Sequence, residues 1–257
     1  MYDMSRYARQ IVFPEWGAKG QTRLQNSRVL IVGAGGLGSR QAELLARAGL
    51  GFMRIADDDN IDLTNIQRQA LYNESDAMQN LPKVEQLKIH LGEINHEVAI
   101  ETARQRVDKF NIHNLAHDVD LIMDGTDNFP SRFLINDYAV KNKKPWIFGG
   151  AIGAEGQTAV FRAGGNPCLR CIMDAPSAAC GENSCRSAGI IGPVVSAIAS
   201  LQTMEALKIL SGSAPAENYL IKINFWMGGI QRILLTGKDL RPDCPCCMKK
   251  EFEYLDD

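Results

Sequence analysis

Short apolar runs alternate with helical segments along residues 28–150, and the runs end at small or acidic residues. Buried strands are predicted at 28–32, 52–56, 98–102, 119–123 and 145–148. Helices are predicted between them at 39–48, 82–94 and 132–141. Pro82 suits the first turn of its helix, because its fixed φ and missing N–H cost nothing there. Alternating strands and helices predict a parallel sheet with helices on both faces.

The pattern changes after Gly149 and Gly150. Further strands are predicted at 157–162, 219–226 and 231–236. The last two are expected to form a hairpin around Gly228 and Gly229, and all three to extend the same sheet as antiparallel strands. The small, polar segment 180–189 predicts a mobile loop. Because no repeat and no linker is evident, we expect a single domain.

The most apolar long stretch, 190–210, predicts a helix that starts at Pro193 and ends before Gly212. It contains Gln202, Glu205 and Lys208. Three such polar residues favour a buried helix over a membrane span.

Composition agrees with an ordinary soluble α/β protein. The 257 residues can bury a large core as one domain, and 45% hydrophobic and 23% charged residues are typical of globular chains. The net charge of −2 gives no reason to expect nucleic acid or an acidic membrane as partner. Residues 1–27 are polar and mixed, which predicts an N-terminal helical arm and no signal peptide. We therefore expect a cytoplasmic protein.

Two Cys-x-x-Cys pairs carry a specific chemical signal: Cys168 with Cys171, and Cys244 with Cys247. Each pair can hold one side of a tetrahedral Zn²⁺, and four thiolates leave no open position, so this zinc would be structural. Buried or disulfide-paired thiols are the alternative. An odd total of seven cysteines favours metal ligation in a reducing compartment. Cys246 is an alternative ligand, but only Cys247 has the right spacing to Cys244.

A glycine-rich turn joins the first predicted strand to the first helix. Gly33, Gly35 and Gly38 form G-x-G-x-x-G, with Gly36 inside it. Glycines let the backbone approach a phosphate, and the helix N-terminus offers free N–H groups. A tight turn without a ligand is the alternative interpretation.

Acidic residues end the second strand. Asp57 stands where a dinucleotide-binding fold places the carboxylate that accepts hydrogen bonds from ribose hydroxyls. Asp58 and Asp59 adjoin it, and we interpret Asp58 as part of a solvated turn.

Cations further along the chain point to a triphosphate. Arg68 and Lys83 would each, taken alone, be read as solvated surface charges. Together they can neutralise a triphosphate and its pyrophosphate leaving group, which NAD does not require. Asp127 follows the fourth strand at the edge where ligands of open α/β sheets bind, and a carboxylate there suggests Mg²⁺. Asp124 has the same edge position and is expected to orient the loop.

These patterns predict a Rossmann-like, mostly parallel sheet extended by antiparallel strands, with a four-cysteine zinc site. An NAD-dependent oxidoreductase that uses the same glycine loop is the alternative to a protein that binds a nucleoside triphosphate. The four histidines show neither metal nor triad spacing, and we interpret them as structural or surface residues.

Six motifs follow one another along nearly the whole chain: Arg6-Tyr7-x-Arg9-Gln10-Ile11, Gly33-Ala34-Gly35-Gly36-Leu37-Gly38, Asn65-x-Gln67-Arg68-Gln69, Pro82-Lys83, Asp124-x-Thr126-Asp127-Asn128 and the two cysteine pairs. In these the chain resembles the ThiF/MoeB/HesA family, bacterial relatives of the ubiquitin-activating enzymes. The resemblance implies an adenylyltransferase that uses ATP and Mg²⁺. Its substrate would be a small ubiquitin-like sulfur carrier ending in Gly-Gly, whose C-terminal carboxylate attacks the α-phosphate. That carboxylate is already ionised at neutral pH, so no general base is needed.

The resemblance also implies residue roles. Arg9 would reach the ATP of the neighbouring subunit in a homodimer. The nucleotide would be contacted by Asn65, by Arg68 and Lys83 at the phosphates, by Asp57 at the ribose and by Asp127 through magnesium. One adenylation domain, 1–257, is expected, with an arm at 1–27, a nucleotide-binding half at 28–150 and a carrier-binding and zinc half at 151–257.

Cys185 matches the family's loop cysteine, which in some members becomes linked to the carrier; a free loop thiol is the alternative. A silent scaffold for a ubiquitin-like partner is a further alternative, against which the intact charged residues argue. The thiamine (ThiS-type) and molybdopterin (MoaD-type) pathways both remain open, with the sequence around Cys185 leaning toward thiamine. Ten residues follow Cys247, so we expect a separate desulfurase or sulfurtransferase to donate sulfur.

Overall fold

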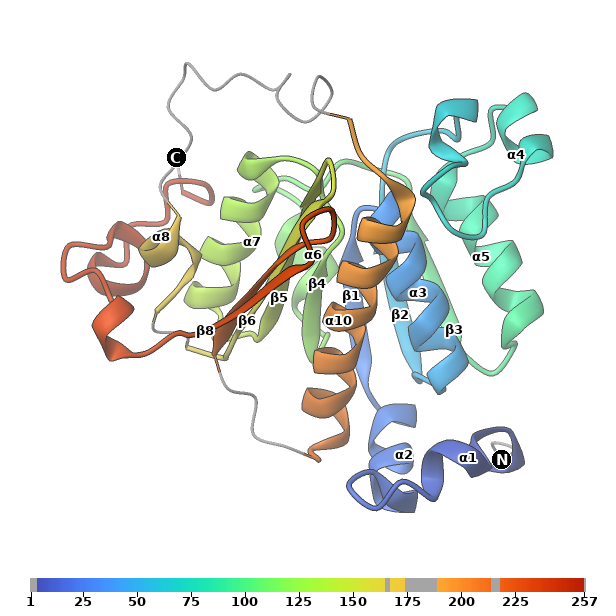
Figure 1. Cartoon of the computed structure of the whole chain (residues 1–257), viewed down its shortest axis with the longest axis horizontal. Coiled ribbons are helices and arrows are strands. Elements are labelled where there is room, and N and C mark those ends of the chain that lie inside the picture. Colours follow the sequence, from blue (N-terminus) through green and yellow to red (C-terminus); the bar gives the residue numbers. More distant parts are fainter. Residues whose placement is uncertain (1–3, 165–166, 174–188, 214–217, 257) are drawn as a thin grey trace.

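The computed structural model describes residues 4–164, 167–173, 189–213 and 218–256. An eight-stranded sheet in the order β3-β2-β1-β4-β5-β6-β7-β8 forms its centre (Figure 1). The strands are β1 Arg28–Val32, β2 Phe52–Ala56, β3 Ala99–Ala103, β4 Leu121–Asp124, β5 Trp146–Ile152, β6 Glu155–Phe161, β7 Tyr219–Asn224 and β8 Gly229–Leu234. The α-helices are α1 Ala8–Ile11, α2 Gly17–Gln25, α3 Gly36–Ala48, α4 Glu74–Met78, α5 Lys83–Ile94, α6 Ile112–Ala116, α7 Phe129–Lys141, α8 Leu169–Ile172 and α10 Gly192–Ser211. Shorter helical turns are η1 Met4–Tyr7, η2 Leu63–Asn65, η3 Gly237–Asp239 and η4 Pro245–Lys249.

Strands β1 to β5 run parallel, as the alternation of strands and helices predicted. The order reverses beside β1: the chain goes outward through β2 and β3 and returns on the other side with β4. At such a switch point the loops that follow the two central strands separate and leave a crevice at the carboxyl edge. The glycine loop follows β1, and the segment Gly125–Asn128 follows β4. Topology alone therefore brings these two motifs together.

Helices cover both faces of the parallel half. Helices α3, α5 and α10 pack on one face, and α6 and α7 on the other (Figure 1). Strand β1 contributes Val29 and Ile31 to the first core and Leu30 and Val32 to the second. A strand buried on both faces needs an apolar residue at every position, which explains the continuous run Val29–Val32.

The antiparallel half contains β6, β7 and β8, as predicted, with β7 and β8 joined in a hairpin around Gly228. Strand β5 does not end at Phe148 as expected but continues to Ile152, because β6 pairs with it along that length. Gly149 is required inside this strand, since a Cβ there would lie 2.4 Å from the Gln202 amide nitrogen. Pro82 is the N-cap of α5 and not its first helical residue.

The N-terminal arm is helical, as predicted, and it packs at the C-terminal end of α3. Tyr7 is buried against Gly49, whose φ of +87° ends that helix. The Gln21 side chain donates a 3.0 Å hydrogen bond to the carbonyl oxygen of Ala48. Figure 1 shows α1 and α2 at the end of the sheet opposite α4.

By length and composition alone, α10 could cross a membrane. In the fold it packs against α3 and against strands β5 and β6. Gln202, in its middle, is fully buried and donates to the carbonyl oxygen of Asp124 at 2.9 Å. The prediction of a buried helix is confirmed.

Candidate functional site: a nucleotide crevice and a four-cysteine cluster

The turn from β1 to α3 has a geometry that only glycine can adopt at two positions. Gly33 has a φ of +94°, and a Cβ there would lie 2.7 Å from the carbonyl oxygen of Gly125. A Cβ on Gly38 would lie 1.8 Å from the carbonyl oxygen of Gly33. Helix α3 starts at Gly36 after Gly35, a residue without a side chain to cap the first N–H groups. Those N–H groups are suited to an anionic ligand.

Asp57 ties the end of β2 to this loop. Its Oδ2 accepts a hydrogen bond from the Ala34 N–H at 2.7 Å, and its Oδ1 accepts one from the Asp59 N–H at 2.9 Å. Burial raises the pKa of the Asp57 carboxyl, while the Lys83 ammonium 4.0 Å away and these N–H groups oppose the rise. Each carboxylate oxygen has a further lone pair. The position is compatible with the predicted bond to a ribose hydroxyl.

Lys83, the first residue of α5, lies beside the same loop and is only 5% exposed. Its Nζ is 2.6 Å from Oδ2 of Asp59, a partner that the sequence did not single out. The Tyr72 hydroxyl lies 2.9 Å from the carbonyl oxygen of Ala34 and 3.3 Å from that of Lys83. Tyr72 thus connects the start of α5 to the glycine loop.

The segment 65–69 passes over the start of α3. The carbonyl oxygen of Arg68 lies 3.4 Å from the place where a Cβ on Gly36 would be. The Arg68 guanidinium is half-buried and donates to the Thr64 carbonyl at 2.9 Å. Asn65 uses its Oδ1 to accept the Asp62 N–H at 3.1 Å, so its side chain caps η2. Gln69 is buried close to Gly35, and its Oε1 has no hydrogen-bond partner among the described residues.

The loop after β4 is organised by Asp124, which is fully buried. Its Oδ1 accepts hydrogen bonds from the N–H and the hydroxyl of Thr126 at 2.9 and 2.6 Å, and its Oδ2 accepts one from the Gly149 N–H at 3.2 Å. Burial raises the pKa of Asp124, opposed mainly by the Arg132 guanidinium. Asp127 is exposed beyond this loop, with a 3.5 Å contact to the Asn128 amide. Its carboxylate can therefore meet a cation from solvent.

Arg132 is a residue of this edge that the sequence analysis placed only at the start of a helix. It is 6% exposed, and its Nη2 donates to the Thr126 carbonyl at 3.0 Å. Its Nε has no hydrogen-bond partner within the described ranges. The ring centroids of Phe129 and Phe148 lie 5.2 and 5.3 Å, respectively, from the guanidinium carbon of Arg132. One feature of the sequence could have marked Arg132 as a residue of this edge: it lies in the first turn of a helix that begins at the crevice.

Arg9 is not brought to this crevice within its own chain. It is exposed on α1, at the end of the sheet where α3 finishes, whereas the glycine loop lies where α3 starts (Figure 1). Thirteen helical residues span about 20 Å. The structure therefore groups the glycine loop, Asp57, Arg68, Lys83 and the Asp127 loop, and leaves Arg9 outside.

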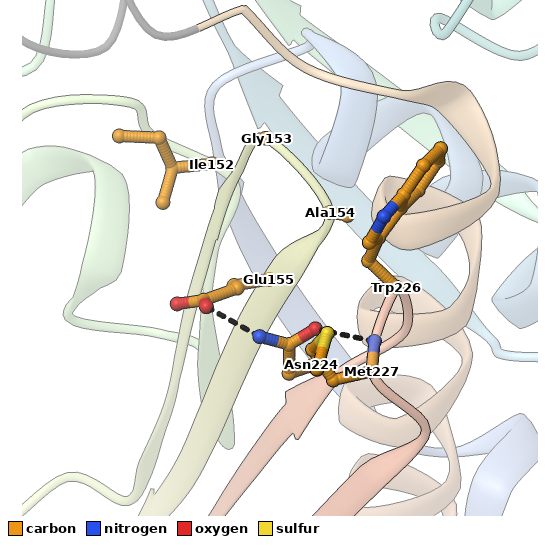
Figure 2. Close-up of a pocket in the computed structure, with 7 residues that line it drawn as sticks. All are labelled: Ile152, Gly153, Ala154, Glu155, Asn224, Trp226 and Met227. Atoms are coloured by element: carbon orange, nitrogen blue, oxygen red, sulfur yellow. Dashed lines mark hydrogen bonds between the residues drawn. The ribbon is translucent and has the colours of Figure 1, made fainter.

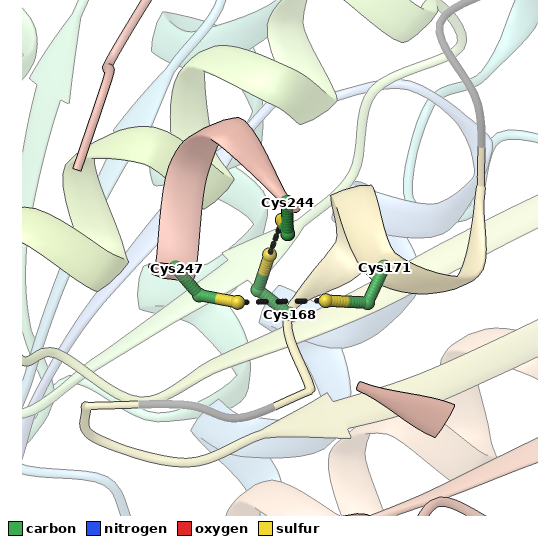
Figure 3. A group of neighbouring side chains, drawn as sticks. All are labelled: Cys168, Cys171, Cys244 and Cys247. Atoms are coloured by element: carbon green, nitrogen blue, oxygen red, sulfur yellow. Dashed lines mark hydrogen bonds between the residues drawn. The ribbon is translucent and has the colours of Figure 1, made fainter. Parts of the chain in front are cut away.

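The four predicted metal ligands converge from two distant segments (Figure 3). All four sulfurs lie within 4.8 Å of one another, with Cys168 and Cys244 at 3.7 Å and Cys171 and Cys247 at 3.4 Å. A tetrahedral site with bonds of about 2.3 Å places its sulfurs about 3.8 Å apart, so this donor set fits zinc. Cys246 is buried but does not belong to the four-sulfur group, as its spacing predicted.

Crowding and burial favour the protonated form of the Cys171 and Cys247 thiols when no cation is present. The neighbouring Cys168 thiol and burial raise the pKa of Cys171 to about 12, and burial with Cys171 raises that of Cys247 to about 12. A divalent cation removes this penalty, because thiolates rather than thiols are its ligands. The cluster is thus chemically suited to a metal.

Cys180 and Cys185, with all of the predicted 180–189 loop except Gly189, lie outside the described residues.

The fold and the crevice are those of a nucleotide-binding α/β enzyme. Cations lie beside the glycine-rich loop, and the cysteine cluster lies against α7, away from that loop. A family model described as the ThiF family matches residues 7–246. The chain belongs to the ThiF family.

Named relatives agree. The sulfur carrier protein ThiS adenylyltransferase of Bacillus subtilis is 38% identical over 97% of this chain and 73% of its own length. The adenylyltransferase and sulfurtransferase MOCS3 of Aedes aegypti is 38% identical over 95% of this chain, which spans about half (55%) of that relative. Among solved structures, E. coli MccB superimposes with a TM-score of 0.80 at 23% identity, covering 96% of this chain and 75% of MccB, which shows a common fold.

These findings confirm the predicted family and fold class, and they identify the chain as an adenylyltransferase. The alternative of an NAD-dependent oxidoreductase is therefore set aside.

Proposed function

We propose that this protein uses ATP and Mg²⁺ to adenylate the C-terminal Gly-Gly carboxylate of a small ubiquitin-like sulfur-carrier protein. The observation that carries the proposal is the grouping of Lys83 and Arg68 at the glycine loop, because two cations there suit a triphosphate. The names of the Bacillus and Aedes relatives support the same substrate class.

The reaction needs alignment and charge stabilisation more than proton transfer. The ionised carrier carboxylate forms a bond to the α-phosphorus, and the bond from that phosphorus to the β-phosphate oxygen breaks. Pyrophosphate leaves with the electron pair, and Lys83 and Arg68 stabilise its negative charge. Asp127 would hold Mg²⁺, which neutralises phosphate charge, and Asp57 would hold the ribose.

A shallow pocket at the edge of the antiparallel half supports carrier binding there. It has a volume of about 370 Å³ and is lined by the β5–β6 turn, by Asn224 at the end of β7 and by Trp226 and Met227 after it (Figure 2). Trp226 and Met227 are each 78% exposed, and Ile230 is 72% exposed. A soluble protein seldom leaves such large apolar side chains together in water without a partner. We propose that the apolar face of the carrier docks here.

The pocket is linked to the nucleotide loop by a short path. Gly153, in the pocket wall, accepts the Ile191 N–H at 3.1 Å. Gly192 follows, and a Cβ there would lie 2.5 Å from the carbonyl oxygen of Gln67. Val195, one turn into α10, contacts Gly36 of the glycine loop. A carrier bound at the pocket could thus extend its C-terminal tail along the start of α10 to the phosphates.

A homodimer would supply Arg9. The distance from Arg9 to the crevice of its own chain rules out direct help there, and Val12 and Phe13 beside it are 72% and 56% exposed. Exposed apolar residues next to an unused arginine favour contact with a second copy. We propose that Arg9 contacts the ATP of the partner subunit.

The proposal has four further parts. The four-cysteine cluster binds zinc, and the protein is cytoplasmic. A separate protein donates the sulfur, and the product enters the thiamine or the molybdopterin pathway. Cys185 would act only after adenylation. Its thiolate would attack either the acyl adenylate, forming a thioester and releasing AMP, or an acyl disulfide between the carrier and the sulfur donor, forming a carrier–Cys185 disulfide and releasing the donor's thiolate. A Cys185→Ser variant is then expected to keep pyrophosphate exchange and to lose any reducible covalent adduct with the carrier in intact-mass spectra. Loss of exchange in a folded variant would contradict this order.

The proposed function is tested by ATP–pyrophosphate exchange with ThiS-type and MoaD-type carriers. We expect magnesium-dependent exchange with one of them and a carrier mass raised by one AMP. A carrier that lacks its last glycine is the matched control and should give neither signal. Absence of exchange with every Gly-Gly carrier tested would contradict the proposed substrate, and the responding carrier would identify the pathway.

A further inference from the structure

Helix α7 carries two fully buried polar residues that the nucleotide crevice does not use. Asn136 and Asp137 are each 0% exposed. The helix is in contact with both α8 and η4, the two elements that hold the cysteine pairs (Figure 1). A buried amide and a buried carboxyl are costly unless all their polar atoms are satisfied. Their partners therefore indicate what they do.

Asn136 contacts both cysteine segments at once. Its Oδ1 accepts the N–H of Leu169, which lies inside the first cysteine pair, at 2.9 Å. Its Nδ2 donates to Sγ of Cys246, which lies inside the second pair, at 3.3 Å. The bond to Leu169 also satisfies the first N–H of α8, whose N-cap, Cys168, makes no side-chain cap.

Asp137 holds the chain that follows the second pair. Its Oδ2 accepts the Tyr254 N–H at 3.2 Å and lies 3.8 Å from the Arg170 guanidinium. Arg170 in turn donates to Glu253 at 2.5 Å. The C-terminal tail and α8 are thus fastened to the same turn of α7.

We propose that Asn136 is a positioning residue for the four-cysteine site: its single amide fixes the two cysteine segments relative to each other, and Cys246 serves as its anchor rather than as a ligand. The inference rests on the proposed metal at Cys168, Cys171, Cys244 and Cys247. Groups that bond to the ligand segments of a metal site set its geometry and affinity.

The test measures metal release from the full-length, zinc-loaded protein into an excess of a chromogenic chelator. Asn136→Leu has a similar volume but removes the two hydrogen bonds to the cysteine segments, together with a 3.4 Å bond to Oδ1 of Asp137, and it should release zinc about 10–100-fold faster than wild type. Asn142→Leu is the matched control: Asn142 caps the same helix, but among the described residues its side-chain amide bonds only the Tyr138 carbonyl, at 3.0 Å. It should release zinc at the wild-type rate. Cobalt-substituted samples report the ligand geometry by their ligand-field absorption, which should change in Asn136→Leu alone.

Cys246 provides a second test that does not depend on folding of the Asn136 variant. Cys246→Ser keeps an acceptor for the Asn136 amide and should retain zinc better than Cys246→Ala. Equal release by Asn136→Leu and wild type, or by the serine and alanine variants, would overturn the inference. Equal acceleration in Asn142→Leu would also overturn it, by assigning the effect to general stability. A wild-type protein that binds no zinc would refute the metal site together with this inference, whereas pyrophosphate exchange judges adenylation independently.

Discussion

Lys83 is a buried ammonium group whose nearest carboxylate, Asp59, is mostly in water, while the buried Asp57 carboxylate lies 4.0 Å away. Its side chain is 6% exposed, whereas that of its partner Asp59 is 67% exposed. Taking an ammonium out of water is expensive, and an exposed partner recovers only part of that cost. Such an arrangement suits a cation that must be ready for an anionic ligand. The phosphates of ATP would complete the neutralisation that Asp59 begins.

Replacing Lys83 therefore tests the phosphate site. Lys83→Ala is expected to lower carrier adenylation by about 10²–10³-fold, because one preorganised charge contact to the developing pyrophosphate is lost. The fold should persist, since Asp59 can be solvated once its partner is gone and Asp57 keeps its hydrogen bonds from the Ala34 and Asp59 N–H groups. Lys88→Ala, an exposed lysine on the same helix, is the control and should keep wild-type exchange. Near-normal exchange in the Lys83 variant would place the phosphates elsewhere.

Among the elements, the join between β1 and α3 is constrained most tightly. Gly38 lies one turn into α3, and its Cα faces the carbonyl oxygen of Gly33 so closely that no side chain fits between them. The strand and the helix can then leave the loop at the angle that a phosphate requires. Gly92 on α5 has nothing within 4 Å of its missing Cβ, so it offers a comparison in which space is not limiting.

The two glycines should respond oppositely to alanine. Gly38→Ala must displace backbone and is expected to lower both the free energy of unfolding and the affinity for ATP, the former by about 1–3 kcal/mol. Gly92→Ala removes a flexible residue from a helix and should stabilise the protein by up to about 1 kcal/mol. Urea unfolding with and without ATP measures both effects. Unchanged stability and ATP affinity in Gly38→Ala would show that the loop can relax.

An ionic network at the amino end of the sheet joins β1, β2 and β3 to the segment before β4. Arg54, with its side chain 8% exposed, donates to Asp118 at 2.6 Å and to Glu101 at 2.7 Å, and Arg28 also contacts Asp118 at 2.6 Å. The hydrogen bond from Arg54, and then that from Arg28, hold the pKa of Asp118 well below its ordinary value near 3.8. Arg54 likewise lowers the pKa of Glu101.

A depressed carboxyl pKa stabilises the fold above the unfolded-state pKa and loses that effect as pH falls through the folded-state value. Asp118→Asn should therefore lower the free energy of unfolding by about 1–3 kcal/mol at neutral pH. The difference in the free energy of unfolding between the variant and the wild type should become smaller as the pH is lowered from about 4 downward. Asp243→Asn, in an exposed pair with Arg241, is the control and should change little. If this difference stays constant with pH, the lost stability comes from packing rather than from the charge of Asp118.

At the scale of the whole molecule, Arg9 and the crevice lie at opposite ends of the sheet, so Arg9 can take part in the proposed function only at the crevice of a second subunit. Arg9→Ala and Asp127→Ala homodimers should each be nearly inactive in adenylation. In a mixed dimer one crevice lacks both groups and the other lacks neither. A pure mixed dimer should then show about half of wild-type activity, and an equilibrated equimolar mixture, in which half of the dimers are mixed, about a quarter, because only intact sites contribute to the rate. Subunit exchange is verified by mass spectrometry, and no recovery after exchange would mean that Arg9 does not act across the dimer.

Much of the fold was predictable from the sequence because its signals are local. The apolar run of β1, the glycines after it and Pro193 in the first turn of α10 each constrain neighbouring residues, and the structure follows them closely. Errors arose where pairing partners decide the boundary, as at β5, which continues to Ile152 because β6 pairs beside it. The cysteine spacing likewise distinguished Cys247 from Cys246 without a structure.

The sequence by itself determined the strand–loop–helix unit, the four-cysteine group proposed to bind a metal and the cations of the crevice, because spacing along the chain constrains each of them. Only the tertiary structure decided that Asp59 pairs with Lys83, that Arg132 is buried under the Thr126 loop and that Asn136 joins the two cysteine segments. Residues far apart in sequence meet in these contacts, and a buried polar group must take whichever partner the packing of strands and helices places within reach. The same packing places Arg9 far from the crevice of its own chain. Spacing along the sequence could not show this distance.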